Sequence, residues 1–336
     1  MAVQLKRLDQ QVIVITGASS GIGLTTAKMA ASRGARVVLA ARDEPDLRAA
    51  VDAIRGAGGE AILVVADVAV QGSVDEVAAA AVREFGGFDS WVNNAGLSIY
   101  GPIEEVPVDD ARRLFDVNYW GVVYGSLAAL PFLKERGGAL INIGSVLSDR
   151  AIPLQGHYSA SKHAVKAFTD SLRMELEKEN APVSVTLVKP GAIDTPYPEH
   201  ARNYMEAEPK HPPPVYAPEV VAETILFCAE HARRDVIVGG GGKMTAAMDA
   251  IPRVADRYMR ATMFDQQKRR EASRPGRRDT LYSPSPGDGR ERGEYPGHVM
   301  QSSLYTRATL RPMATLLGVA AVGVGMAFAA RSLRDD

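Results

Sequence analysis

The amino-acid sequence predicts an α/β protein built on a doubly wound parallel sheet of about seven strands. Three observations predict this fold class: short apolar runs alternate with Ala-rich helical runs, a glycine-rich turn follows the first apolar run, and 46% of the 336 residues are hydrophobic. A chain of this length and composition can bury one large core or two smaller ones. A wholly disordered or fibrous protein is therefore excluded.

The expected strands are short, rich in β-branched residues and mostly apolar throughout, as strands covered on both faces are. Their residue ranges are 12–16, 36–40, 61–65, 90–92, 139–143, 183–188 and 236–238. Helical runs lie between them, for example 24–33, 44–56 and 73–85. This repeated order of strand, helix and strand predicts parallel pairing.

Composition divides the chain into three parts. Residues 1–267 are expected to form the folded domain. Residues 268–312 are rich in Arg, Ser, Pro and Gly and poor in large apolar residues, which predicts a disordered, flexible polar linker. Residues 313–330 carry no charge and predict an apolar C-terminal helix. Such a helix would rise about 27 Å, close to the thickness of a hydrocarbon core.

We expect residues 313–330 to be a transmembrane helix that anchors the protein to a membrane by its C-terminus, with the catalytic domain in the cytoplasm. Alternatively, the segment folds back on the domain or makes oligomer contacts, which leaves the protein soluble. The single cysteine, Cys228, cannot form a disulfide within the chain. The sequence therefore does not need an oxidising compartment.

The overall charge excludes some partners. Lys and Arg number 39 against 40 Asp and Glu, so nothing favours nucleic acid as a partner. The charge is uneven, because residues 268–336 hold 12 basic and 7 acidic side chains. No cluster of His, Asp and Glu has ligand spacing, so we expect no metal.

The turn TGASSGIG at residues 16–23 follows the first expected strand and leads into a helix. Gly17 allows a tight turn, Gly21 lets the backbone approach a pyrophosphate, and Gly23 permits close packing of helix on strand. The helix N-terminus then offers free amides to an anion. Alone such a turn could merely join strand to helix, but its place after the first strand favours a dinucleotide site.

Four spaced motifs carry a family resemblance. They are TGxxxGxG at 16–23, NNAG at 93–96, Ser145, and Tyr158 followed by Lys162 in a YxxxK spacing. With Asn118 in a VN pair and PGxxxT at 190–195, the sequence resembles the short-chain dehydrogenase/reductase (SDR) family over about residues 8–245. The resemblance implies a Rossmann-like fold and an oxidoreductase that uses a nicotinamide dinucleotide.

The motifs and the resemblance together indicate which residues would hold the cofactor. Asp67 and Val68 stand where the family holds the adenine ring, and Ala95 and Gly96 where it lines the ribose. The full set expected to bind cofactor is Gly17, Ser19, Ser20, Gly21, Ile22, Gly23, Arg42, Asp67, Val68, Asn94, Ala95, Gly96, Tyr158, Lys162, Pro190, Gly191, Ile193 and Thr195.

The end of the second expected strand favours NADP(H) over NAD(H). An NAD site in this fold usually has an acidic residue there, which binds the ribose 2′-hydroxyl. This chain has Ala41 at that position, and Arg42 follows with a guanidinium suited to a 2′-phosphate. Arg42 could instead be an ordinary surface arginine, and the acidic Asp43 one residue further on means that NAD is not excluded as the cofactor.

The expected catalytic residues are Ser145, Tyr158, Lys162 and Asn118. A free tyrosine holds its proton to a pKa of about 10, so it needs a nearby cation to exchange protons near neutrality. Tyr158 and Lys162 are four residues apart, hence on one face of a helix, where the ammonium would stabilise the phenolate. Ser145 would polarise the substrate oxygen. The resemblance implies that Lys162 also reaches the nicotinamide ribose and that Asn118 holds a water of a proton relay.

Residues 194–218 are expected to be a lid that sets specificity, although they could be a plain surface connection. An apolar pocket wall is expected from Leu97, Ile99, Tyr100, Leu147 and Leu154. These features predict an NADP-dependent carbonyl reductase or secondary alcohol dehydrogenase with a lipophilic small-molecule substrate, and we expect a homo-oligomer. The alternative is a non-catalytic NADPH-binding sensor or scaffold, which has no need of Ser145, Tyr158 and Lys162 together.

Overall fold

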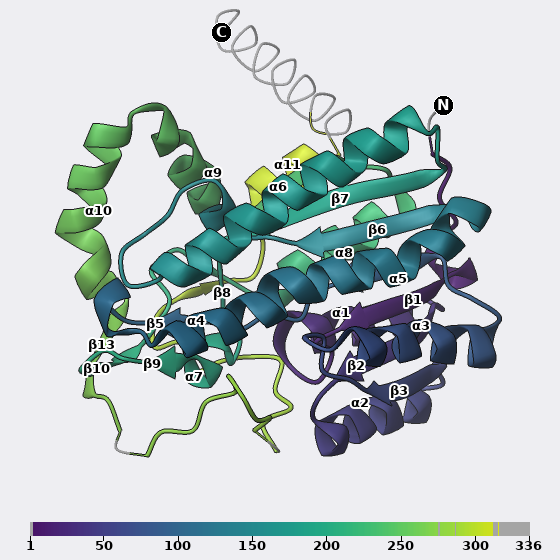
Figure 1. Cartoon of the computed structure of the whole chain (residues 1–336), viewed down its shortest axis with the longest axis horizontal. Helices are drawn as coiled ribbons and strands as arrows, with labels where there is room; N and C mark the ends of the chain where they lie inside the picture. Colours follow the sequence, from purple (N-terminus) through teal and green to yellow (C-terminus); the bar gives the residue numbers. More distant parts are fainter. Residues whose placement is uncertain (1–2, 275, 286, 312–314, 316–336) are drawn as a thin grey trace, which may run out of the picture.

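A seven-stranded parallel sheet forms the centre of the molecule (Figure 1). The computed structural model describes residues 3–274, 276–285, 287–311 and 315. The strand order is β12-β7-β6-β4-β1-β2-β3, which confirms the expected sheet. The strands are β1 Val12–Thr16, β2 Arg36–Ala41, β3 Ala61–Val65, β4 Ser90–Asn93, β6 Gly138–Ile143, β7 Val183–Pro190 and β12 Asp235–Val238.

Helices cover both faces of this sheet, with α1, α2 and α8 on one face and α3, α5 and α6 on the other (Figure 1). The helices are α1 Gly21–Ser32, α2 Glu44–Gly56, α3 Gln71–Phe85, α4 Val108–Phe115, α5 Gly121–Arg136, α6 Gly156–Lys178, α7 Tyr197–His200, α8 Pro218–Glu230, α9 Gly240–Ala247, α10 Pro252–Gln266 and α11 Leu304–Leu310.

Alternate residues of a strand pack in two separate hydrophobic cores. Ile13 and Ile15 of β1 pack in the core of α1 and α8, whereas Val12 and Val14 pack in the core of α3 and α5. Successive side chains of a strand point to opposite faces, so a strand buried on both faces is apolar along most of its length. This is why the continuous apolar runs indicated strands correctly.

The strand order reverses direction at β1, which lies between β4 and β2. In doubly wound sheets a crevice opens at such a point, beyond the carboxyl ends of the strands. The loops that follow β1, β2, β4 and β6 therefore meet there.

A π-helical turn, Asp116–Trp120, joins α4 to α5. The residues on both sides of each junction keep right-handed helical backbone angles, so the three pieces form one continuous helix. The wider turn buries Val117 and Asn118. Single π turns of this kind are frequent at functional sites.

Three small sheets tie the chain between 192 and 216 to distant segments. β8 Ala192–Ile193, β11 Val215–Tyr216 and β14 Val299–Met300 form one of them. β5 Ile99–Tyr100 pairs with β9 Arg202–Asn203, and β10 Ala207–Pro209 pairs with β13 Lys268–Ala272. The expected lid is therefore held by segments from both halves of the chain.

The expected flexible linker over 268–312 is corrected by this structure. Its described residues are packed on the domain through β13, β14 and α11. Arg277, for example, donates hydrogen bonds to the carbonyls of Ala201, Pro198 and Glu199 and pairs with Glu208 at 3.0 Å. The prediction from polar composition was wrong, because arginines can order a segment when a preformed surface supplies hydrogen-bond acceptors.

The expected apolar C-terminal helix at 313–330 lies outside the described residues, except for Thr315. Among the helices built from described residues, none combines the length and the hydropathy that a membrane crossing requires.

Candidate active site

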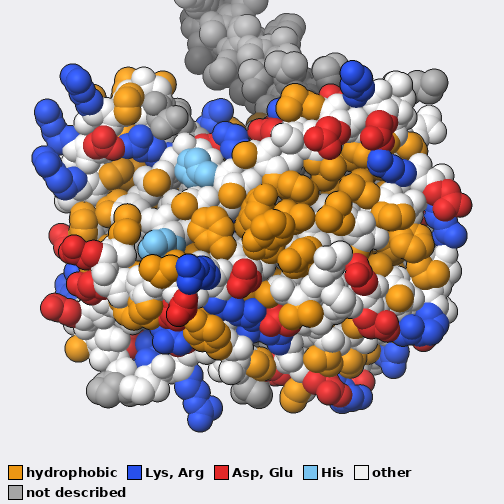
Figure 2. Space-filling model, in the orientation of Figure 1, with side chains coloured by type: hydrophobic (Ala, Val, Ile, Leu, Met, Phe, Trp, Pro, Cys, Tyr) orange, Lys and Arg blue, Asp and Glu red, His pale blue; other side chains and the backbone are white. Residues whose placement is uncertain are grey.

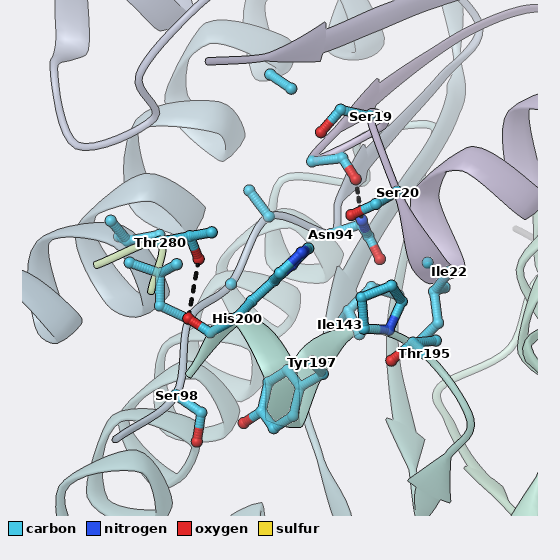
Figure 3. A pocket seen from close by; sticks show the side chains of 18 of the residues that line it. Ser19, Ser20, Ile22, Asn94, Ser98, Ile143, Thr195, Tyr197, His200 and Thr280 are labelled. Atoms are coloured by element: carbon cyan, nitrogen blue, oxygen red, sulfur yellow. Dashed lines mark hydrogen bonds between the residues drawn. The ribbon is translucent and has the colours of Figure 1, made fainter. Parts of the chain in front are cut away.

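A cavity of about 250 Å³ opens at the carboxyl ends of the strands and collects most of the expected site residues. Figure 3 shows Ser19, Ser20 and Ile22 on one side and Ser98, Tyr197 and His200 on another. The expected residues that line it are Gly17, Ser19, Ser20, Gly21, Ile22, Arg42, Asp67, Val68, Asn94, Ala95, Gly96, Ser145, Tyr158, Lys162, Pro190, Gly191, Ile193 and Thr195. Gly23 and Asn118 are not part of the lining.

The glycine-rich turn brings backbone amides to the cavity. Gly17 and Gly21 have φ of +65° and +53°, a left-handed conformation that favours glycine. Gly23 packs on the turn itself, because a Cβ there would lie 2.2 Å from the Gly17 carbonyl oxygen. Ser20 precedes α1 and makes no side-chain capping bond. An N-terminus of this kind fits a pyrophosphate.

Arg42 lies at the far end of the cavity, where an adenosine ribose would be expected. Its guanidinium donates to the carbonyl oxygens of Thr280 and, at 3.0 Å, Tyr282. Burial lowers the pKa of Arg42, and the charge of Asp67 acts in the opposite direction. The structure therefore places Arg42 at the site, although it is already bonded to a distant segment.

The C-terminal segment also contributes lining residues that sequence reasoning missed. Thr280, Pro284, Ser285 and Asp288 all line this end of the cavity. No sequence signal pointed to them, because the segment resembles a disordered linker in composition.

Ser145, Tyr158 and Lys162 come together as expected. Ser145 follows β6, and its hydroxyl accepts a hydrogen bond of 3.1 Å from the Leu147 amide, which fixes its orientation. Tyr158 and Lys162 lie in the first turns of α6. The Lys162 Nζ is 5.8 Å from the Tyr158 ring centroid and donates to the Ile143 carbonyl at 2.8 Å.

Burial dominates the titration of this pair. It raises the pKa of Tyr158, and the nearby Tyr197 and Ser145 hydroxyls oppose that rise with a smaller effect. It also lowers the pKa of Lys162 to about 8. The Lys162 ammonium donates to the Ile143 carbonyl, and its expected effect on the Tyr158 pKa stays a prediction.

Asn118 lies behind the cavity wall. Its side chain accepts from the Leu97 amide at 2.7 Å and donates to the Leu97 carbonyl at 3.0 Å and the Ser161 hydroxyl at 3.1 Å. Gly96 separates it from the cavity, since a Cβ on Gly96 would lie 3.5 Å from Asn118 Oδ1 and 3.7 Å from Lys162 Nζ. Asn118 thus braces the wall beside Lys162, and its water-relay role stays a prediction.

The lid side of the cavity carries polar groups without partners. The centroid of the Tyr197 ring lies 5.7 Å from the centroid of the Tyr158 ring. It lies 5.8 Å from the centroid of the His211 ring, on which Tyr197 stacks. Tyr197 OH, Ser98 Oγ and His211 Nε2 are buried and have no hydrogen-bond partner among the described residues. Burial lowers the pKa of His211 to about 4.

The expected apolar wall is only partly present. Leu97 lines the cavity, together with Val117 and Ile143. The other four residues are buried in the cores and are absent from the lining: Ile99, Tyr100, Leu147 and Leu154. The part of the chain that the structure describes also holds no cluster of His, Cys, Asp and Glu suited to a metal.

Comparison with known proteins places the sequence in a family. The short chain dehydrogenase family profile matches residues 11–205. The chain is 48% identical over 322 residues to "Uncharacterized oxidoreductase YxnA" of Bacillus subtilis, covering 95% of this chain and 90% of the relative. It is 33% identical over 261 residues to "Putative oxidoreductase SadH" of Mycobacterium tuberculosis, covering 74% and 92%.

Solved structures agree with this placement. An SDR protein from Burkholderia phymatum in complex with NAD matches with a TM-score of 0.67 at 29% identity, covering 73% of this chain and 94% of that one. An alcohol dehydrogenase from Thermococcus sibiricus complexed with 5-hydroxy-NADP matches with a TM-score of 0.60 at 28% identity, covering 68% and 95%. The chain therefore belongs to the short-chain dehydrogenase family of oxidoreductases.

Proposed function

We propose that the protein is an NADP-dependent carbonyl reductase or secondary alcohol dehydrogenase. The observation that carries this proposal is that Ser145, Tyr158 and Lys162 line the same cavity as the glycine-rich turn. A bound nicotinamide would supply or accept the hydride. A non-catalytic sensor of NADPH would need the turn but not these three side chains.

In this proposal each of the three side chains has a separate task. The hydroxyls of Ser145 and Tyr158 hold the substrate oxygen, and the Tyr158 hydroxyl donates the proton during reduction. Burial raises the Tyr158 pKa, so the phenol stays protonated at neutral pH, which favours reduction there. Lys162 supplies positive charge beside the phenol. A panel of ketones, aldehydes and secondary alcohols with both cofactors tests the proposal, and absence of turnover with all of them would favour the sensor.

We propose that NADP(H) is preferred, because β2 ends in Ala41 where an NAD site usually has an acidic residue, and Arg42 follows it. The matching structures hold NAD in one case and 5-hydroxy-NADP in the other, so the choice depends on this chain's own residues.

Changing Ala41→Asp together with Arg42→Gln is expected to shift the NADPH-to-NADH ratio of kcat/KM by about 10- to 100-fold towards NADH. The variant loses a charge-assisted bond to the phosphate and gains a repelling carboxylate. Steady-state kinetics with both cofactors measure the ratio. Equal use of both cofactors by the unchanged protein would contradict the preference.

The substrate that we propose has a lipophilic body and an uncharged oxygen group near the reacting carbonyl. Leu97 and Val117 offer apolar contact, while Tyr197, Ser98 and His211 offer buried groups without partners. Among the described lining residues the only Lys and Arg are Lys162 and Arg42, which belong to the catalytic and nucleotide ends. His211 is neutral at pH 7, so its ring does not attract an anion.

His211→Phe is expected to raise KM for 2-hydroxyacetophenone about tenfold and to leave KM for acetophenone within twofold. The phenyl ring keeps the stacking on Tyr197 but cannot bond to the second oxygen. Kinetics on the two ketones give the comparison. An equal change for both ketones would show that His211 only shapes the lid.

Membrane anchoring through residues 313–330 also stays a proposal, supported by the absence of charge in that segment. The full chain and a version ending at Arg311, which keeps the packed C-terminal residues, are compared after an alkaline carbonate wash. Recovery of both in the soluble fraction would end this proposal.

A homo-oligomer is proposed from the apolar side chains that gather over α5 and α6 (Figure 2). Trp120, Leu127 and Met174, on or next to these helices, are exposed by 44%, 52% and 58%. A second copy of the chain would cover such a patch. Light scattering on the purified protein gives the number of copies, and a monomer at all concentrations would contradict it.

A further inference from the structure

The C-terminal segment forms a strap across the nucleotide end of the cavity. We define the strap as residues 279–285 and 287–294. Figure 1 shows this yellow-green segment running past α7 towards the edge where β2 and α2 lie. Thr280, Pro284, Ser285 and Asp288 of the strap line the cavity, and Figure 3 places Thr280 beside His200.

The strap occupies two of the donors that a dinucleotide would use. The Gly21 amide, at the start of α1, donates to the Arg290 carbonyl at 2.8 Å. The Arg42 guanidinium donates to the Thr280 and Tyr282 carbonyls. A helix N-terminal amide and an arginine are the groups expected to bind pyrophosphate and 2′-phosphate. The strap carbonyls therefore stand where phosphate oxygens would be expected.

Side-chain contacts hold the strap on three helices. Glu291 pairs with Lys28 of α1 at 2.7 Å, and Arg292 pairs with Glu219 of α8 at 2.8 Å. Asp288 contacts His200 of α7 at 2.7 Å. The pairs with Lys28 and Glu219 are partly exposed, so each contributes little to holding this end of the strap.

We propose that the strap is an internal competitor of the dinucleotide, which must leave the Gly21 amide and Arg42 before the cofactor binds. This inference rests on the proposed nucleotide-binding function. One N–H bonded to a protein carbonyl is not free for a phosphate oxygen, so strap-closed and nucleotide-bound states exclude each other at these atoms. The observed nucleotide affinity is then the intrinsic affinity reduced by the fraction of molecules with an open strap.

Two variants that remove side chains of opposite charge test this competition. Glu291→Gln breaks the pair with Lys28, and Arg292→Gln breaks the pair with Glu219. Electrostatics alone would make Glu291→Gln bind the anionic cofactor more tightly and Arg292→Gln more weakly. Strap release predicts the same sign for both, namely a two- to fivefold tighter Kd for NADPH, and their combination a larger effect.

The matched control is Glu223→Gln. Glu223 of α8 pairs with Arg33, next to the end of α1, so the control removes an exposed α1 to α8 ion pair that does not involve the strap. Its Kd for NADPH is expected to stay within a factor of 1.5, well below the effect of the strap variants. Titration calorimetry on the full-length wild-type protein and on all four variants measures these Kd values without any turnover.

The outcomes separate the strap from the proposed function. Tighter binding by both strap variants supports competition. Tighter binding by Glu291→Gln with weaker binding by Arg292→Gln means a charge effect, and weaker binding by both means that the strap closes over the cofactor; either result overturns the inference. If no variant and no wild-type protein binds NADPH or NADH, the proposed function itself fails.

Limited trypsin digestion gives a second readout that does not depend on affinity. Arg290 and Arg292 are cleavage positions within the strap. Competition predicts that saturating NADPH speeds cleavage there in the wild-type chain, because the strap is displaced. Slower cleavage with NADPH would overturn the inference.

Discussion

Replacing Tyr158 with Phe is expected to lower kcat for carbonyl reduction by about 10²- to 10⁴-fold while changing the Kd for NADPH less than twofold. The ring keeps its packing against Tyr197, but the proton that the substrate oxygen must receive is gone. Lys162→Met should weaken both turnover and binding, since its charge serves the phenol and lies within the same cavity. Stopped-flow reduction and calorimetry measure the two effects.

Tyr100→Phe is the control for this experiment. Tyr100 is a fully buried tyrosine, and its hydroxyl has no hydrogen-bond partner among the described residues. It does not line the cavity, so kcat should stay within about twofold. A Tyr158→Phe protein that turns over at the wild-type rate would disprove the assignment of Tyr158 as the proton donor.

Gly23→Ala is expected to lower the free energy of unfolding by about 3 kcal/mol and to abolish nucleotide binding. The added Cβ would lie 2.2 Å from the Gly17 carbonyl oxygen and 2.6 Å from Asn94 Nδ2. Asn94 Nδ2 donates to the carbonyls of Thr16 and Gly17, so the turn and α1 cannot both keep their positions. Urea unfolding measures the loss.

Gly72→Ala provides the matching control in α3. Nothing lies within 4 Å of a Cβ built on Gly72, and its backbone is helical. Alanine should therefore raise the free energy of unfolding by roughly 0.5–1 kcal/mol, as the helix propensities predict. If Gly23→Ala were as stable as Gly72→Ala, the close approach at the turn would have no structural importance.

The sheet could be predicted because its signal is local. Most strands of the sheet are short and largely apolar runs, and the predicted range 61–65 coincides with β3. The C-terminal segment could not be predicted, because its order depends on acceptors far away in sequence. Arg277, for instance, binds carbonyls between Pro198 and Ala201, and no pattern near Arg277 reveals them.

The candidate site was likewise predictable only in part from the sequence. Spacing predicted that Tyr158 and Lys162 share one helix face, and the cavity contains both. Spacing did not reveal that the Lys162 ammonium is directed to a backbone carbonyl or that Arg42 is bonded to the strap. Both facts come from the final three-dimensional packing. The aromatic stack of Tyr197 on His211 could not be predicted either, because no periodic pattern links the short helix α7 to the loop that holds His211.

The π-helical turn at Asp116–Trp120 accommodates one extra residue within a continuous helix. An α-helix advances about 100° for each residue, so an extra residue in a regular α-helix would rotate α4 by about that angle relative to α5. The wider turn takes up the extra residue locally, because its hydrogen bonds join residues five apart instead of four apart. The buried Leu114 of α4 and the buried Ala129 of α5 can therefore both face the core. At this turn, evolution can change the length of the helix by one residue without rotating the flanking helices away from the sheet.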